Sequence, residues 1–286
     1  MEQNHKKYSR SRETWRRLKK NKLSVIALVV LALLLLTALF GPLIAPYSYE
    51  TQNPKDRYAK PSMEHLLGTD RLGRDIFSRL IYGARQSLTM AIIAVAVSAV
   101  VGCTIGAIAG YYGGWVENLS MRLLDIYQAI PMFLLCVTLA AILGPSLKNA
   151  ILALGISGVP GYARLMRASV LTVREKEFIE SAKAIDLSAP SIILHHIIPN
   201  AIAPIIVEIT MGVGAMILAG SALSFIGLGA QPPIPEWGYM IAEARNVMRD
   251  HPPLALYPGV CIMLTVLSCN LLGDGLRDAL DPRLRN

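Results

Sequence analysis

Long apolar stretches alternate with shorter polar segments along this chain. The first stretch follows a basic segment, residues 1–22, and no charged side chain occurs from 23 to 49. Its core, 23–44, is long enough for an α-helix to cross about 30 Å of hydrocarbon. Because it is longer than the apolar region of a signal peptide and lacks a clear cleavage site, we expect a retained transmembrane helix at 23–45.

Five further apolar stretches predict a total of six spans. Four of them are long and poor in charged residues, at about 86–116, 126–147, 203–226 and 252–272. The other, 149–163, is short and interrupted by glycine and proline, so it must borrow residues from its flanks or line a protein-covered interior. Six spans place both ends of the chain on one side of the membrane.

Gly102, Gly106 and Gly110 recur at every fourth position of the second apolar stretch. This spacing aligns three glycines on one helix face and lets another backbone approach closely. We therefore expect a tight helix–helix contact along this face.

The basic residues predict the orientation of the chain. Segment 1–22 is rich in lysine and arginine, which favours a cytoplasmic N-terminus. With six spans, segment 276–286 is also cytoplasmic, 46–86 forms an extracytoplasmic loop, and 87–275 forms the main transmembrane domain. The expected fold class is an all-α polytopic membrane protein.

Composition supports a membrane protein and excludes several other classes. Hydrophobic residues make up 53% of the 286 residues and charged residues only 17%, whereas soluble domains carry about 25% charged residues. The net charge of +8 would suggest nucleic acid as the partner of a soluble protein. Here the charges flank apolar blocks and form no basic face with interleaved aromatics, so no nucleic-acid partner is expected.

The candidate chemical groups predict neither catalysis nor a metal site. All four cysteines lie in apolar stretches without a C-x-x-C pair, and the five histidines have no ligand spacing. No convincing nucleophile triad or paired carboxylate occurs. We therefore expect no catalytic residue, no metal and no enzymatic activity.

A long polar segment separates the fourth and fifth predicted spans. Residues 164–196 carry apolar side chains at helical spacing, among them Val173, Phe178, Ala182 and Ile185. An ordinary loop needs only a few residues. We expect one or two short cytoplasmic helices, which could pack on this chain, lie on the membrane or dock with a soluble partner.

Part of this segment resembles the E-A-A-x-x-x-G loop of permease subunits of binding-protein-dependent ABC importers. Glu180, Ala182 and Pro199 fall in register, and Ser181 replaces an alanine. Asp186 replaces the glycine, but aspartate tolerates the left-handed conformation better than most residues, so the turn should be kept. The resemblance implies that these residues, within a coupling loop at about 164–200, couple the chain to an ATPase.

Three further blocks resemble the dipeptide, oligopeptide and nickel permeases of the same family. They lie at 65–79, 223–238 and 273–283. Together with the coupling loop, their order resembles that of the second permease subunit. The resemblance implies uptake of di- or oligopeptides by alternating access, with nickel or another small solute as the alternative.

The chain contains no G-x-x-x-x-G-K-[ST] segment, so it lacks a P-loop for ATP. The resemblance implies that ATP and magnesium bind to partner subunits and that this chain holds no cofactor. The implied partners are a second homologous permease, two ATP-binding subunits and an extracytoplasmic substrate-binding protein. The implied location is a prokaryotic cytoplasmic (inner) membrane.

Several charged residues have two open interpretations. Glu208, the only charge between 197 and 235, either lines the translocation path or reaches water near the cytoplasmic end. The candidates for structural contacts at the outer side or for partner-permease contacts are Asp70, Arg74, Asp75, Arg79, Glu236 and Trp237.

A secondary transporter driven by an ion gradient is the competing functional class. It would explain the interrupted fourth span, because discontinuous helices form the binding sites of such proteins. It would not explain the polar segment 164–196, and more ionisable residues would be expected inside the membrane.

Overall fold

The computed structural model describes residues 10–281, and side chains from residue 13 onward. Within this range the structure is helical and contains no β-strand, only an isolated bridge between Thr69 and Asp75. In chain order, the elements are α1 (Arg10–Leu18), α2 (Lys22–Ile44), the 3-10 turn η1 (Pro54–Asp56), α3 (Ile76–Tyr112), α4 (Gly114–Gln128), α5 (Met132–Leu143), α6 (Leu147–Val173), α7 (Glu177–Ala184), α8 (Ala189–Ser191), the π-helical segment η2 (Ile192–Ile197), α9 (Ile198–Ala201), α10 (Ala203–Phe225), α11 (Trp237–Ala244) and α12 (Pro253–Leu280).

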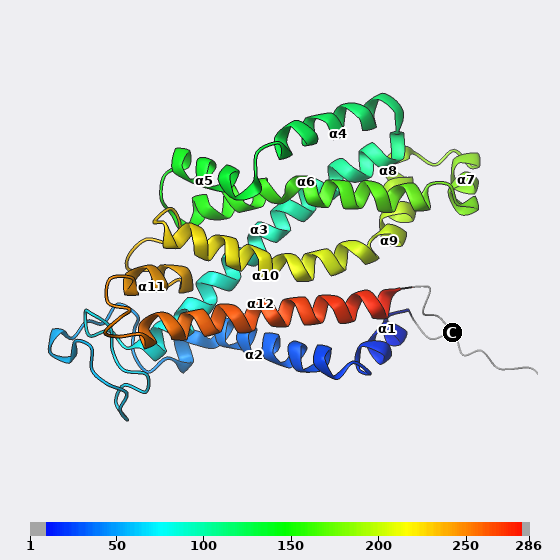
Figure 1. The fold of residues 1–286 in the computed structure, drawn as a ribbon. Coiled ribbons are helices and arrows are strands. Elements are labelled where there is room, and N and C mark those ends of the chain that lie inside the picture. The colour runs from blue at the N-terminus through cyan, green and yellow to red at the C-terminus, as the bar shows by residue number, and fades with distance from the viewer. Residues whose placement is uncertain (1–9, 282–286) are drawn as a thin grey trace, which may run out of the picture.

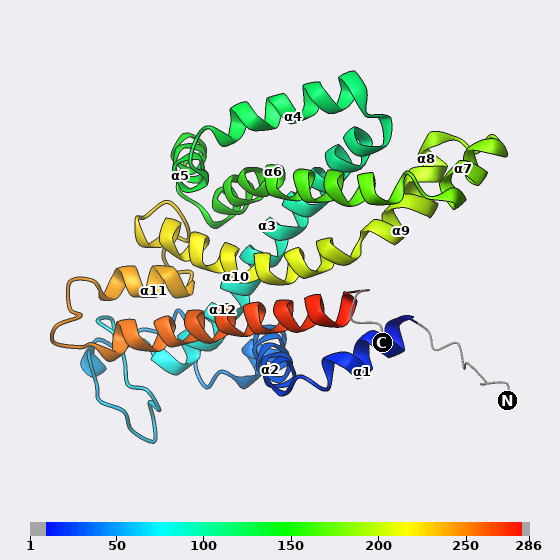
Figure 2. The ribbon, with the colours of Figure 1, turned by 45° about the vertical axis from the view of Figure 1, so that its right-hand side comes forward.

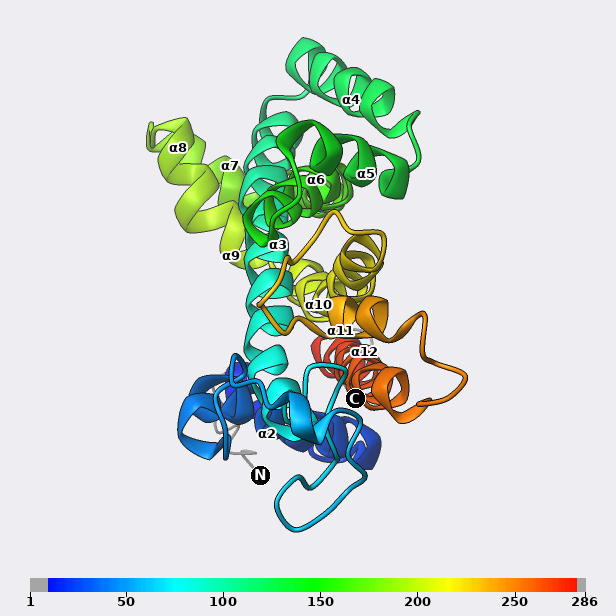
Figure 3. The ribbon, with the colours of Figure 1, turned by 90° about the vertical axis from the view of Figure 1, so that its left-hand side faces the viewer.

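Helix α3 runs through the middle of the molecule and contacts most of the other long helices. Figure 3 shows it between α2 and α12 on one side and α4, α5 and α6 on the other. Its most extensive contact is with α6, and α10 packs against both α3 and α12. The prediction of an all-α membrane protein is confirmed for the described residues.

The short polar elements gather at the two ends of the bundle (Figure 1). One end holds α1, α7, α8, α9 and the end of α12, and Figure 2 shows the same grouping from another side. The opposite end holds α11 and the segment 46–75. The N-terminal helix, the predicted coupling segment and the last helix therefore share one end of the molecule.

The predicted count of six spans is not confirmed. Four described helices are long and apolar enough to cross a membrane, namely α2, α3, α10 and α12. The pair α4 and α5 would add one span if it is counted as a single broken helix, since the two are bent by 80°. The sequence predicted one continuous helix at 126–147, and this prediction is wrong. The break comes at Pro131, which disfavours helical geometry in the preceding residue and donates no N–H.

Helix α6 is longer than the short fourth span that the sequence predicted. It continues through Pro160 and past two arginines to Val173, over 27 residues. Arg164 lies 2.8 Å from Asp125, and the Nε of Arg167 lies 2.7 Å from Glu117. Both acids belong to the neighbouring helix α4. Because each arginine has an acidic partner there, α6 continues as a helix past Arg164 and Arg167.

The three glycines of α3 face α6 at very short range. A Cβ at Gly102 would lie 2.5 Å from the carbonyl oxygen of Val159, and one at Gly106 would overlap the carbonyl oxygen of Ala163. A Cβ at Gly110 would lie 2.8 Å from the side chain of Val170. The expected tight contact along this face is therefore present.

Replacing Gly106 by alanine should destabilise the folded chain by about 1–3 kcal/mol, because the new Cβ forces α3 and α6 apart. Gly259→Ala is the matched control, since a Cβ there meets nothing within 4 Å. Thermal unfolding of the detergent-purified variants measures the difference. Equal midpoints for the two alanine variants would contradict the close approach of α3 and α6.

Candidate functional site

Helix α7 presents two different faces at one end of the molecule. Ile179 and Ala182 are buried, at 0% and 5% exposure, and α7 packs against η2. Glu180 and Ser181 are exposed. The structure therefore places the first motif residues on the solvent side of a helix that its apolar side fixes to the chain. Ile179, which the sequence analysis did not single out, is detectable by its i,i+3 spacing from Ala182.

Asp186 closes α7 in the conformation that glycine would adopt. Its φ is +57°, in the left-handed region. The N–H of Leu187 donates to the carbonyl of Ala182 at 3.2 Å, and the N–H of Asp186 donates to that of Lys183 at 3.0 Å. These bonds satisfy carbonyls at the helix end, as in a glycine-terminated helix. The expected turn is present despite the substitution.

Substitutions at Asp186 test this turn. Asp186→Gly should leave the loop intact, whereas Asp186→Val should cost about 1–2 kcal/mol, because a β-branched residue is strained at positive φ. Amide hydrogen exchange over 177–197 would report the local loss of protection. Equal exchange in the valine and glycine variants would show that the left-handed turn does not hold this segment.

A continuous helical run leads from this turn back to the membrane helices. It contains the π-helical segment η2, in which the N–H of Ile198 donates to the carbonyl of Ile193, five residues earlier. The wider turn directly precedes Pro199, which has no N–H for the normal ladder. Pro199 is exposed and lies on this run, whereas Ile192 and Ile197 are buried beside it. Pro199 therefore shapes the run that follows α7.

Apolar side chains remain exposed around α7. Phe178 is 40% exposed, Ile185 72% and Leu194 59%. They lie among charged residues, at the end of the bundle that also holds α1 and the end of α12 (Figure 2). Of the four apolar residues at helical spacing, Val173 and Ala182 are buried, whereas Phe178 and Ile185 are exposed.

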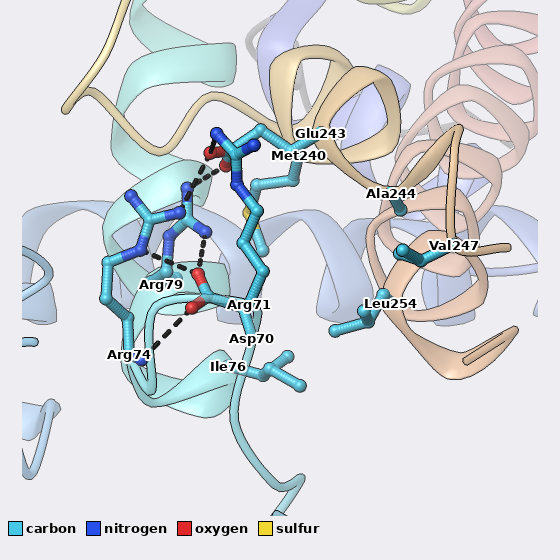
Figure 4. A pocket seen from close by; sticks show the side chains of 10 residues that line it. All are labelled: Asp70, Arg71, Arg74, Ile76, Arg79, Met240, Glu243, Ala244, Val247 and Leu254. Atoms are coloured by element: carbon cyan, nitrogen blue, oxygen red, sulfur yellow. Dashed lines mark hydrogen bonds and ion pairs between the residues drawn. The ribbon is translucent and has the colours of Figure 1, made fainter. Parts of the chain in front are cut away.

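A buried network of charges ties the outer segment to α11 (Figure 4). Asp70 accepts from the Nε of Arg74 at 2.6 Å and from Arg79 at 2.5 Å. The carboxylate of Glu243 accepts from the guanidinium of Arg74 at 2.8 Å and from that of Arg79 at 2.5 Å. The guanidinium of Arg71, which is about half exposed, lies 3.7 Å from the same carboxylate. The two inner arginines are 2–3% exposed. The two negative charges of Asp70 and Glu243 therefore neutralise the two positive charges of Arg74 and Arg79 inside the chain.

The electrostatics of this network favour its charged form. Burial lowers the pKa of Arg74, but the charges of Asp70 and Glu243 and the hydrogen bonds to them outweigh this effect and raise it. Arg74 therefore stays protonated. Sequence reasoning missed Glu243, and its only signal is one acid in the otherwise uncharged helix α11.

The other outer candidates are also held by contacts within the chain. Asp75 caps α3 by accepting from the N–H of Ser78 at 2.7 Å, and it lies 2.9 Å from Nδ1 of His65. Glu236 caps α11 and accepts from the hydroxyl of Ser87 at 2.9 Å. The structure places these residues within the chain and leaves little of them exposed to a partner.

Trp237 is 1% exposed, and its indole N–H donates to the carbonyl of Leu80 at 3.1 Å. Its backbone N–H donates to the hydroxyl of Ser87 at 3.2 Å. The side chain therefore joins α11 to α3, and no part of it is available as an anchor for another subunit.

Glu208 is exposed on α10 and lines two cavities. One, of about 600 Å³, lies among the ends of α6, α10 and α12 and includes Lys176 and Arg277. The other, of about 330 Å³, lies between the α4–α5 break, α6 and α10. Glu208 therefore faces open space within the bundle from the wall of both cavities. Among residues 10–281, no group of three or more side chains that could hold a metal ion occurs.

Comparisons with known proteins place the whole chain. Residues 102–286 match the family described as binding-protein-dependent transport system inner membrane component, and residues 9–61 match the N-terminal transmembrane domain of oligopeptide transport permease C. The chain is 49% identical over 275 residues to the dipeptide transport system permease protein DppC of Alkalihalophilus pseudofirmus, covering 96% of this chain and 90% of the relative.

A second relative and a solved structure agree with this placement. The glutathione transport system permease protein GsiD of Escherichia coli O1:K1 is 45% identical over 274 residues, covering 96% of this chain and 90% of that protein. The inward-facing MetNI methionine ABC transporter has a similar fold, with a TM-score of 0.56 at 17% identity over 72% of this chain and 98% of that one. This chain belongs to the permease family of binding-protein-dependent ABC importers, whose members span the inner membrane.

Proposed function

We propose that this chain is the second permease subunit of an importer for di- or oligopeptides. Two relatives with 45–49% identity are named for dipeptide and glutathione transport, and both of those substrates are peptides. Substrate moves by alternating access between two rigid-body arrangements, without covalent chemistry on this chain. Nickel or another small solute is the alternative cargo.

The driving force comes from separate subunits. The chain has no P-loop, so ATP and magnesium bind to two partner ATPase subunits. A second homologous permease completes the membrane part, and an extracytoplasmic binding protein delivers the substrate. The chain itself is a transport subunit without an ATPase site.

The exposed face of α7 carries this proposal. Phe178 of α7, Ile185 at its C-terminal end and Leu194 of η2 are exposed apolar side chains, and Glu180 and Ser181 are exposed on the same helix α7. Apolar side chains on a polar segment are typical of a docking surface for another protein. We assign this surface to the ATPase subunit.

The connections of α7 explain how a push on it reaches the spans. Lys183 lies over the ring of Tyr111 at the end of α3, 5.8 Å from its centroid. The chain enters α7 from α6 and leaves it through η2 and α9 to α10. Both cavities beside Glu208 are lined by α6 and α10. Displacing α7 relative to the bundle therefore changes the space where those two helices face each other.

The orientation follows from the same assignment. Because α1, α7 and the end of α12 share one end of the bundle, a docked ATPase makes that end cytoplasmic (Figure 1). The lysines and arginines of 1–22 agree with this side. The segment 46–75 and α11 then face the binding protein.

Co-purification tests the assembly. The chain is tagged at its C-terminus, extracted from its native membrane in mild detergent, and analysed for associated proteins. We expect a second permease and P-loop ATPases to accompany it. Recovery of the chain alone, or only as a homodimer, would contradict the proposed function.

A further inference from the structure

The smaller cavity beside Glu208 has the form of a small-ligand site. Its volume of about 330 Å³ lies at the lower end of the range for small-molecule pockets. The α4–α5 break forms one side, with Tyr127 and Gln128 at the end of α4, Ile130 in the break and Met132 at the start of α5. A bend of 80° directly beside a cavity resembles the discontinuous helices that line transport sites.

Glycines form the opposite wall and leave room in the cavity. A Cβ at Gly158 would crowd Ser98 and Met216, and one at Gly212 would overlap the hydroxyl of Tyr162. A Cβ at Gly161 would meet nothing within 4 Å. Gly161 therefore borders open space, and a side chain introduced there would enter the cavity without a clash.

The polar groups of this cavity carry one unbalanced charge. Glu208 is the only ionisable residue of α10 and makes no salt bridge within residues 10–281. A carboxylate within a membrane helix is costly unless it faces water or a cation. No basic side chain lines the cavity. The larger cavity offers Lys176 and Arg277 on its wall, whereas in the smaller cavity a cation beside Glu208 would have to come from a ligand.

Two hydroxyl groups, those of Ser157 and Tyr127, lie next to each other in the wall of the same cavity. Ser157 is 6% exposed, and neither its Oγ nor the hydroxyl of Tyr127 makes a well-formed hydrogen bond within the described residues. Buried polar groups in native proteins are normally satisfied. The hydroxyl of Tyr162, by contrast, lies 3.3 Å from the backbone carbonyl of Glu208, to which it donates. The cavity therefore offers one carboxylate to a ligand, and the hydroxyl groups of Ser157 and Tyr127 belong to its wall.

We propose that this cavity binds the α-ammonium group of the transported peptide, with Glu208 as its counter-ion; this rests on the proposed function. An ammonium group donates charge-assisted hydrogen bonds, and a carboxylate is a strong acceptor for them. Ile130, Met132 and Met216 supply the apolar contacts for a side chain of variable shape. Glu208 also lines the larger cavity, so the ammonium group stays beside its counter-ion as the peptide moves on.

Uptake of alanyl-alanine by the complete transporter is the first test. Glu208→Gln should lower uptake at limiting peptide by about tenfold or more, because a charge-assisted hydrogen bond is lost. Glu208→Asp should retain part of the activity. Asp250→Asn, an exposed carboxyl between α11 and α12 that lines neither cavity, is the matched control and should transport normally. Uptake by Glu208→Gln within twofold of the control would overturn the proposal.

A labelling experiment tests occupancy without transport. Gly161→Cys places a thiol at the open edge of the cavity, and its reaction with N-ethylmaleimide is followed in the purified complex, with the unmodified chain as background. Alanyl-alanine should slow the reaction more than N-acetyl-alanyl-alanine does, and adding Glu208→Gln should abolish this difference. Equal protection by the free and the acetylated peptide would overturn the ammonium site. Failure of the unmodified transporter to take up any peptide would instead contradict the proposed function.

Discussion

Replacing Glu180 by lysine together with Ala182 by aspartate is expected to abolish ATP-driven uptake while the chain remains in the membrane. Glu180 is exposed on α7, so the first change reverses a charge on the docking face. Ala182 is 5% exposed, so the second puts a carboxylate against the apolar side that fixes α7 to the chain. Charge reversal at an interface and loss of its support should reduce uptake by at least about tenfold.

The measurement compares uptake with ATP hydrolysis in reconstituted vesicles. We expect the double variant to lose its associated ATPases on purification but to keep the partner permease. Asp250→Lys, a charge reversal between α11 and α12 at the opposite end of the molecule, serves as the control and should transport normally. Normal uptake by the double variant would exclude α7 as the coupling element.

Removing Glu243 should destabilise the folded chain by roughly 3–5 kcal/mol. Arg74 and Arg79 are 2–3% exposed and share Glu243 as a partner, so Glu243→Ala leaves two buried charges with only Asp70 between them. Asp125→Ala is the control, because its pair with Arg164 is about half exposed and worth roughly 0–1 kcal/mol. Thermal unfolding in detergent measures both variants.

A second substitution tests whether buried cations without partners cause the loss in Glu243→Ala. Because the loss comes from uncompensated buried cations, adding Arg79→Met should restore part of the stability. If Glu243→Ala and Asp125→Ala unfold at the same temperature, the network does not hold α11 to the outer segment.

Helices with one continuous apolar run could be predicted from the sequence. Helices α2 and α10 lie where the apolar stretches indicated them, α12 continues past its predicted end at 272 to Leu280, and α3 extends its predicted stretch toward Asp75. The α4–α5 break was missed because residues 126–147 are apolar throughout, and Pro131 in such a run is compatible with either a kink or a break. Whether the chain kinks or breaks at Pro131 depends on how the neighbouring helices pack, and the residues around Pro131 do not encode that packing.

Long-range pairing accounts for the other differences. Arg164 and Arg167 made the fourth span look short, but their partners lie 39 and 50 positions away on α4. Glu243 pairs with Arg79 and Arg74, which precede it in the chain by 164 and 169 positions. The local sequence therefore gave no sign that Glu243 was their partner. Asp186, in contrast, was predictable because its role depends only on its own backbone conformation. Local conformation could be derived from the sequence, and the pairing of distant charges could not.

The most direct test of the account is peptide uptake into vesicles that contain the complete complex. The binding protein and a labelled dipeptide are placed on the side of the membrane that segment 46–75 faces, and ATP on the side that α7 faces. We expect uptake that requires both ATP and the binding protein. Glu180→Lys with Ala182→Asp should abolish it. Uptake driven by a proton or sodium gradient without ATP would contradict the account and identify an ion-coupled transporter.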